Sequence, residues 1–215
     1  MRESTAKKIR SFRLVPVAVI EDAGVALDLA DALLAAGLPI IEVTFRTAAA
    51  VEAIARIAKH RPAMLVGAGT LLSGHSVQRA LAAGAQFGVA PGLNERTVEA
   101  AAKAGMDFIP GIATPSEVEI ALELNLKLLK FFPAEQAGGV NLLKALEGPY
   151  GQTGVQFIPT GGVNIRNLKD YLGLKSVVAV GGSWFVDKKL VAAGAWATIT
   201  RLTQEALELT QTVEK

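Results

Sequence analysis

The chain has 215 residues, of which 51% are hydrophobic and 20% charged, so it can bury a large core and wholesale disorder is excluded. Lysine and arginine exceed aspartate and glutamate by only two (22 against 20), and no arginine-rich run occurs, which argues against a dedicated nucleic-acid surface. Cysteine is absent, and the only histidines are His60, in a helical stretch, and His75, in a loop. We therefore expect no disulfide framework, no thiolate nucleophile and no bound metal or cofactor.

The N-terminal segment does not have the pattern of a targeting signal. Basic residues precede a short apolar stretch at 14–20, but Glu21 and Asp22 close it and no small-residue cleavage site follows. The longest uncharged stretches, 62–78 and 148–165, are broken by glycine, proline and polar residues, so neither predicts a membrane span. We expect a soluble, cytoplasmic protein that binds neither membranes nor nucleic acid.

Short β-type runs alternate with Ala- and Leu-rich segments along the whole chain. The Ala- and Leu-rich segments repeat apolar residues three and four positions apart, as Leu27, Ala30, Leu33 and Leu34 do, which predicts helices. The runs that predict strands lie at 15–20, 40–45, 63–67, 86–90, 107–109, 127–132, 155–160 and 176–180.

Local signals mark where several of these helices begin and end. Gly37, Gly84 and Gly105 can take the left-handed conformation that ends a helix. The segment Thr114-Pro115-Ser116-Glu117 has a capping threonine, a proline in the first turn and a glutamate three residues on, which predicts a helix start. A final amphipathic helix presents one apolar face, made of Ile199, Leu202, Ala206, Leu209 and Val213.

Eight strands alternating with helices fit either a closed (β/α)8 barrel or an open doubly wound sheet. Eight units is the count of the barrel, and the length lies near its lower limit of about 200 residues. No G-x-G-x-x-G follows the first strand, and Gly67-Ala68-Gly69-Thr70 lacks the third glycine of that fingerprint. We therefore expect an α/β fold, a (β/α)8 TIM barrel with an N-terminal helical extension, as a single domain over residues 1–215.

In a barrel, catalytic groups lie at the carboxyl ends of the strands, so polar residues inside apolar runs are the candidates. Lys130 stands in Leu128-Leu129-Lys130-Phe131-Phe132-Pro133, and strand alternation places it on the face of Leu128 and Phe132. Apolar surroundings favour a neutral, nucleophilic amine. The alternative is a structural lysine that reaches water at the strand end. Lys127, on the opposite face, is expected to be exposed or to face a helix.

A second strand, Ile40-Ile41-Glu42-Val43-Thr44-Phe45-Arg46, also carries polar residues. Alternation places Glu42, Thr44 and Arg46 on one face. Glu42 could transfer protons while the planar fork of Arg46 binds a substrate carboxylate, or the two could form a purely structural ion pair. Thr70 is a hydroxyl at the end of a third strand that could bind substrate or cap the next helix.

Glycine pairs follow the seventh and eighth strands, in Thr160-Gly161-Gly162-Val163 and Gly181-Gly182-Ser183-Trp184. Glycines let the backbone approach an anion, and N–H groups at a helix start bind phosphate. The alternative is two tight turns without a ligand. Because barrels often place a phosphate site after these two strands, the position of both pairs favours the phosphate site.

Seven segments bear on the family of the chain: Ile41-Glu42-Val43-Thr44-Phe45-Arg46-Thr47, Val66-Gly67-Ala68-Gly69-Thr70, Ala90-Pro91-Gly92-Leu93, Ile109-Pro110-Gly111-Ile112, Lys130-Phe131-Phe132-Pro133-Ala134-Glu135, Pro159-Thr160-Gly161-Gly162 and Gly181-Gly182-Ser183-Trp184. In order and approximate spacing, from about Val15 to Phe185, they resemble the class I aldolases that cleave 2-keto-3-deoxy-6-phosphogluconate (KDPG). The same family includes 4-hydroxy-2-oxoglutarate (KHG) aldolase activity. Many relatives carry a basic residue where this chain has Ile20-Glu21, and a serine where it has Ala90.

The resemblance implies a homotrimer of (β/α)8 barrels and a metal-free carbon–carbon lyase. It assigns Lys130 as the Schiff-base lysine and Glu42 as the acid/base carboxylate. Arg46 and Thr70 match the residues that hold the carboxylate of the pyruvyl portion. Pro91 and Phe132 match the apolar contacts beside the reacting carbons, and Thr160 is a further substrate-binding position. The phosphate positions are Gly161, Gly162, Gly182 and Ser183.

The function expected from this resemblance is cleavage of KDPG to pyruvate and glyceraldehyde 3-phosphate, with KHG cleavage as a related activity. The partners are then small molecules, a 2-keto-3-deoxy sugar acid phosphate and pyruvate. The alternatives are an aldolase for the phosphogalactonate epimer or for unphosphorylated KHG, a phosphosugar isomerase or epimerase that forms no imine, and a catalytically silent barrel that binds phosphorylated ligands. Imine formation on Lys130 separates the aldolases from the other two.

Overall fold

The computed structural model describes residues 3–213, so the outermost residues of the domain predicted over 1–215 lie outside the described part. Helix α1 (Glu3–Phe12) comes first, and strands then alternate with helices. The strands are β1 (Leu14–Ala18), β2 (Ile40–Thr44), β3 (Leu65–Gly69), β4 (Phe87–Val89), β5 (Asp107–Ile109), β6 (Gly111–Ile112), β7 (Leu128–Phe131), β8 (Gln156–Pro159) and β9 (Val180–Gly182). The helices are α2 (Ala26–Ala35), α3 (Ala50–His60), α4 (Gly74–Ala82), α5 (Glu95–Lys103), α6 (Pro115–Glu123), α7 (Gly139–Tyr150), α8 (Leu168–Leu172), α9 (Lys188–Ala192) and α10 (Trp196–Gln211).

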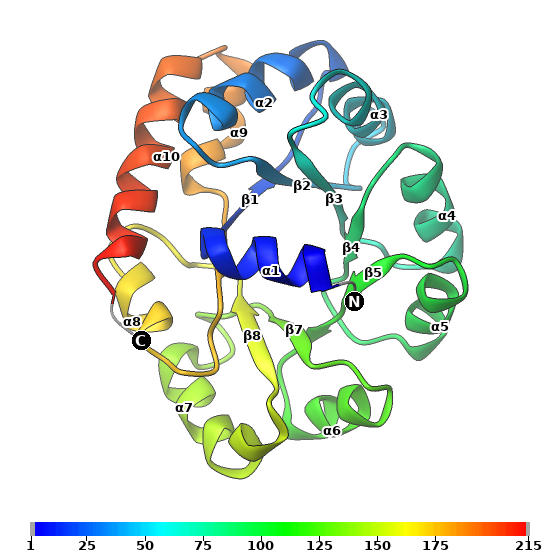
Figure 1. Ribbon diagram of the computed structural model, residues 1–215, viewed down its shortest axis with the longest axis vertical. Helices are drawn as coiled ribbons and strands as arrows, with labels where there is room; N and C mark the ends of the chain where they lie inside the picture. Colours follow the sequence, from blue (N-terminus) through cyan, green and yellow to red (C-terminus); the bar gives the residue numbers. More distant parts are fainter. Residues whose placement is uncertain (1–2, 214–215) are drawn as a thin grey trace.

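All paired strands run parallel, in two sheets. A six-stranded sheet has the order β5-β4-β3-β2-β1-β9, and a three-stranded sheet has the order β6-β7-β8. The sheets curl around a common centre, with every helix except α1 on the outside (Figure 1). Strand residues are therefore buried on both faces, as parallel sheets require. The α/β fold with parallel strands is the one predicted.

Backbone contacts connect the two sheets at both of their edges. Pro110 separates β5 from β6, and its carbonyl accepts a 2.8 Å hydrogen bond from the N–H of Lys130 on β7. At the other edge, single bridges join Phe157 to Val177 and Thr160 to Gly181, which places β8 beside β9. The carboxyl ends of all the strands consequently meet at one face of the molecule.

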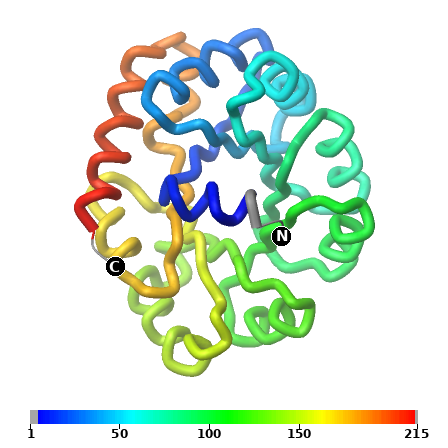
Figure 2. The backbone as a smooth tube through the Cα atoms, viewed as in Figure 1, coloured from blue at the N-terminus to red at the C-terminus, as the bar shows by residue number. Residues whose placement is uncertain are grey.

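Helix α1 lies across the middle of the curled sheets, in front of the strands in Figures 1 and 2. Its Arg10 guanidinium donates two hydrogen bonds, of 2.9 and 2.7 Å, to the side-chain oxygen of Gln156 at the start of β8. Ile9 on the same helix is fully buried. The helix therefore covers the amino ends of the strands, opposite the face where the carboxyl ends meet.

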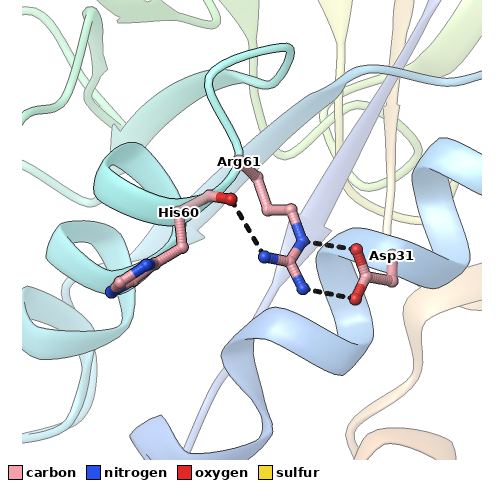
Figure 3. A network of polar contacts seen from close by, with 3 residues as sticks. All are labelled: Asp31, His60 and Arg61. Carbon is pink, nitrogen blue, oxygen red and sulfur yellow. Dashed lines mark hydrogen bonds and ion pairs between the residues drawn. The ribbon is translucent and has the colours of Figure 1, made fainter.

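The local signals for helix ends are confirmed. Gly37, Gly84 and Gly105 have positive φ angles of 83°, 93° and 68°. Thr114 caps α6 in a capping box with Glu117. At the end of α3, Arg61 donates to both carboxylate oxygens of Asp31 on α2 and to the carbonyl of His60, which ties the two helices together (Figure 3).

Most strand boundaries and the end of the last helix differ from those predicted by one or more residues, and two of the strand differences have a clear local description. The third strand begins at Leu65 instead of 63, because the Met64 N–H turns back to the Arg61 carbonyl. The last strand covers 180–182 instead of 176–180, because a Val177-to-Leu174 turn and a Ser176-to-Glu147 hydrogen bond hold the segment before it. Helix α10 ends at Gln211, so Val213 lies beyond it.

The prediction that His75 lies in a loop, and the list of eight strands, which lacked β6, are also wrong. His75 lies in the first turn of α4, since Ser73 caps that helix by accepting the N–H of Ser76. His75 and His60 are both exposed. Neither histidine therefore points toward the centre of the curled sheets.

Candidate active site

Lys130 and Glu42 meet inside the curled sheets. Lys130 is the third residue of β7 and Glu42 the third of β2, and both are at most 6% exposed. The Lys130 Nζ donates to Glu42 Oε1 across 3.4 Å, an ion-pair distance. A carboxylate this close to an amine can exchange protons with it, directly or through one water. Both side chains start within their strands instead of at the carboxyl ends.

The two side chains line a cavity whose other walls are almost entirely apolar. Such walls weaken the hydration of an ammonium group and strengthen its interaction with a nearby carboxylate. Phe132, just after β7, places its ring centroid 5.3 Å from the Lys130 Nζ, as expected from the shared face. Besides Lys130 and Glu42, the residues that line the cavity are Ile9, Val15, Phe87, Val89, Ile109, Ile158 and Thr160.

Arg46 does not form the structural ion pair with Glu42 that was left open as an alternative. Strand β2 ends at Thr44, so the alternation that predicted a shared face does not continue to Arg46. Arg46 is exposed, and its guanidinium makes no ion pair within residues 3–213, whereas Glu42 is paired with Lys130. Thr44 is buried and donates to the Ala18 carbonyl at 3.2 Å. The Arg46 guanidinium is therefore exposed just beyond the carboxyl end of β2.

The other predicted substrate contacts follow the carboxyl ends of their strands. Thr70 comes directly after β3 with a φ of 60°, and Pro91 lies two residues after β4. The alternative that Thr70 caps the next helix is wrong, because Ser73 caps α4. Lys127 is exposed, as expected. These positions agree with the predicted binding roles, which themselves stay predictions.

The two glycine segments lie side by side, since Thr160 bridges Gly181. At Gly181 and Gly182, however, a side chain of the protein itself fills the space of the missing Cβ: a methyl group would lie 2.2 Å from Thr160 Oγ1 and 1.9 Å from the Trp184 ring. Gly161 and Gly162 have φ angles of 99° and 81°. Packing and turn geometry thus explain the glycines, and a phosphate site rests on the backbone N–H groups instead.

These N–H groups lie in a loop and not at a helix start as predicted. Helix α8 begins only at Leu168, six residues after Gly162. Within residues 3–213, neither the Gly162 nor the Val163 N–H donates a hydrogen bond to another group of the chain. Two neighbouring free N–H groups form a concave donor site for an anion. Ser183, at the end of the adjacent β9, is exposed at the same face.

Sequence reasoning missed two contributors to the site. Ile9 belongs to a helix at the start of the chain, and no local pattern indicates that this helix reaches beneath Lys130. From the sequence, Gly69 belongs only to larger segments, the incomplete nucleotide-binding fingerprint and one of the segments that carry the resemblance, and has no predicted role of its own. The structure shows that a methyl group there would lie 2.1 Å from Glu42 Oε1, so the carboxylate occupies the space that this glycine leaves.

Within residues 3–213, no three His, Asp or Glu side chains lie close enough together to hold a metal ion. Over the same range, no helix combines the length and apolar character needed to cross a bilayer.

The model of the family described as KDPG and KHG aldolase matches residues 5–202. The chain belongs to this aldolase family. It is 46% identical over 195 residues to the KHG/KDPG aldolase of Escherichia coli K12, with 91% of each chain covered.

Two solved aldolases of the family have the same fold. The KDPG aldolase of Legionella pneumophila, with pyruvate captured as a covalent carbinolamine, superposes with a TM-score of 0.89 at 38% identity and covers 93% of this chain and 96% of its own. The KDPG aldolase of Zymomonas mobilis ZM4, solved with 3-phosphoglycerate, gives a TM-score of 0.90 at 37% identity, with 100% and 98% covered.

Replacing Gly69 with alanine is expected to lower aldol cleavage by about 10- to 100-fold, because the new methyl group displaces the Glu42 carboxylate from Lys130. Steady-state pyruvate release measures the effect, and circular dichroism checks the fold. Gly148→Ala on α7, where a methyl group meets nothing within 4 Å, is the control and should keep the parental rate. Equal rates for the two folded variants would show that Gly69 does not set the position of Glu42.

Proposed function

We propose that this chain is a class I aldolase that cleaves KDPG to pyruvate and glyceraldehyde 3-phosphate. The observation that carries the proposal is the buried Lys130 amine 3.4 Å from the Glu42 carboxylate, in an otherwise apolar cavity at the centre of the fold. An amine so placed can serve as a nucleophile toward a ketone, with a proton carrier at hand. The captured pyruvate in the Legionella relative is the product of this kind of attack.

In the first half of the reaction, Glu42 takes a proton from the paired Lys130 ammonium, and the neutral Nζ then attacks the ketone carbon of the substrate and forms a carbinolamine. Glu42 delivers a proton to the departing hydroxyl, water leaves, and a protonated imine remains. Burial keeps competing water away from this pair. The positive nitrogen then withdraws electrons from the bond that must break.

In the second half, Glu42 takes the proton of the fourth-carbon hydroxyl, through a water, and the bond between the third and fourth carbons breaks. Glyceraldehyde 3-phosphate leaves, and the electron pair of the broken bond remains on the three-carbon fragment, which is now an enamine of Lys130. Glu42 returns a proton to the enamine carbon, and addition of water to the imine releases pyruvate and the free amine. One carboxylate thus serves as both acid and base.

The mouth of the cavity supplies the groups that orient the substrate. Arg46, exposed and without an ion-pair partner among residues 3–213, binds the pyruvyl carboxylate together with the Thr70 hydroxyl. The N–H groups of Gly162 and Val163, with Ser183 beside them, receive the phosphate. Holding both ends aligns the breaking bond with the imine π system. Pro91 and Phe132 contact the carbons between them.

The proposal extends to the complete architecture. The contacts at Pro110 and between Thr160 and Gly181 support closure of the two sheets into one single-domain (β/α)8 barrel, with α1 as an extension across its amino end. We also propose the homotrimer that the resemblance implied, and the expectation of a cytoplasmic location stays a prediction. The residues described are sufficient for imine chemistry without a metal or cofactor.

Substrate choice is tested by comparing kcat/KM for KDPG, its galactonate epimer and unphosphorylated KHG. We expect KDPG to exceed KHG by about 10- to 100-fold, since a hydrogen bond to a charged group contributes roughly 1.5–3 kcal/mol. A preference for the galactonate epimer would change the substrate and leave the mechanism intact. Turnover of none of the three by folded protein would overturn the proposal.

A further inference from the structure

A glutamate lies directly beneath the Gly161–Gly162 turn. Glu135 comes five residues after Lys130, and its backbone N–H donates to the Gly161 carbonyl at 3.0 Å. Its side chain fills the space next to Gly162, where a methyl group would lie 2.4 Å from Glu135 Cγ. Glu135 therefore contacts the turn through both its backbone and its side chain.

The carboxylate of Glu135 is held by a buried tyrosine. Tyr171 on α8 is fully buried, and its hydroxyl donates to Glu135 Oε1. Burial and the bond to Glu135 raise the pKa of the Tyr171 hydroxyl, so this group remains a donor. Gly139, at the start of α7, packs against this pair, since a methyl group there would lie 3.3 Å from both the Tyr171 hydroxyl oxygen and Glu135 Oε1.

Two asparagine side chains hold the turn from its other side. Asn164 and Asn167 donate to the Gly162 carbonyl at 2.9 and 3.2 Å. The carbonyls of both glycines are thus occupied by donors of the chain, while the N–H groups of Gly162 and Val163 are not bonded within residues 3–213. The turn is fixed with its donors free, which is the state that an anion requires.

We propose that Tyr171 and Glu135 are positioning residues that hold the Gly161–Gly162 turn ready for the phosphate of the substrate. The hydroxyl of Tyr171 keeps the Glu135 carboxylate directed toward α8. Without this bond, the carboxylate can accept hydrogen bonds from the free N–H groups of the turn, or it can place its negative charge beside the phosphate. Either outcome weakens phosphate binding and leaves the Lys130–Glu42 chemistry unchanged. This inference rests on the proposed function.

Tyr171→Phe tests the proposal because it keeps the buried ring and removes only the hydroxyl. We expect KM for KDPG to rise about five-fold, the effect of losing one hydrogen bond of ordinary strength, with kcat changed less than about two-fold. The KM for KHG, which has no phosphate, should not change. Competitive inhibition by inorganic phosphate should weaken by the same factor as KDPG binding.

Tyr150→Phe is the matched control. Tyr150 and Tyr171 are the only tyrosines of the chain, and the Tyr150 hydroxyl also donates to a glutamate, Glu119, at 2.8 Å. That bond lies between α7 and α6, so its loss should leave both KM values unchanged. The double variant Tyr171→Phe/Glu135→Gln removes the released charge as well, and should regain most of the affinity for KDPG.

Unchanged KM for KDPG in folded Tyr171→Phe, or an equal loss with KDPG and KHG, would overturn the inference. If Tyr171→Phe does not fold, Glu135→Asp is measured instead, because its shorter side chain withdraws the carboxylate from Tyr171; the same selective rise in KM is expected, and its absence counts against the proposal. Failure of the proposed function is recognised separately, since the wild-type protein would then cleave neither substrate.

Discussion

Replacing Lys130 with alanine is expected to lower aldol cleavage by on the order of 10⁴-fold or more, because no other amine can form the imine at this position. Lys130 is the amine of the cavity, and the apolar walls around it offer no substitute nucleophile. Pyruvate release from KDPG, followed over hours at high enzyme concentration, measures the loss. Lys127→Ala, three residues earlier and exposed, is the matched control and should keep the parental rate.

The fold of Lys130→Ala must be checked by thermal unfolding, because removal of one partner leaves the buried Glu42 carboxylate without its cation. We expect a lower melting temperature but a cooperative transition. A folded Lys130→Ala protein that cleaves KDPG at more than a few per cent of the parental rate would contradict imine catalysis by this residue. The isomerase and ligand-binding alternatives would then need to be reconsidered.

Glu42→Gln should lower kcat by roughly 10²–10⁴-fold, the usual contribution of a positioned acid or base. Glutamine keeps the volume and hydrogen-bonding reach of the side chain but cannot carry the protons, so dehydration, bond cleavage and enamine protonation all slow down. The neighbouring Gly69 leaves space for the glutamine as it does for the glutamate. Steady-state kinetics with KDPG, beside Glu52→Gln on the exposed face of α3 as control, measures the effect.

Borohydride trapping of pyruvate separates the role of Glu42 from that of Lys130. The Glu42→Gln protein should still accumulate the adduct, more slowly than the parental protein, because its amine is present. A Glu42→Gln variant with parental kcat would show that another group, or water alone, carries the protons.

The alternation of short strands was enough to predict the face on which Lys130 lies. It directed Lys130 toward the ring of Phe132, and the structure places both on the same face. It did not predict that Glu42 and Lys130 are partners, because they are 88 residues apart and lie on strands that are not neighbours in either sheet. Arg46 was placed on the Glu42 face only by extending the alternation past the end of β2.

The parts of the site that sequence reasoning did not reach depend on contacts between distant segments. Ile9 closes the cavity from a helix before the first strand, and Tyr171 holds Glu135 from 36 residues away. The sequence predicted that the glycine pairs leave space for a bound anion, whereas Thr160 and Trp184 fill the space that Gly181 and Gly182 leave. In each case the sequence contains the residue but no local pattern that indicates its neighbour.

The central claim is that Lys130 forms an imine with the keto acid, and reduction by borohydride in the presence of pyruvate tests it most directly. Peptide mass spectrometry should then find the reduced pyruvyl adduct on Lys130, at near-stoichiometric level, and on no other lysine. Folded protein whose Lys130 peptide stays unmodified, or whose adduct lies on a different lysine, would contradict the account.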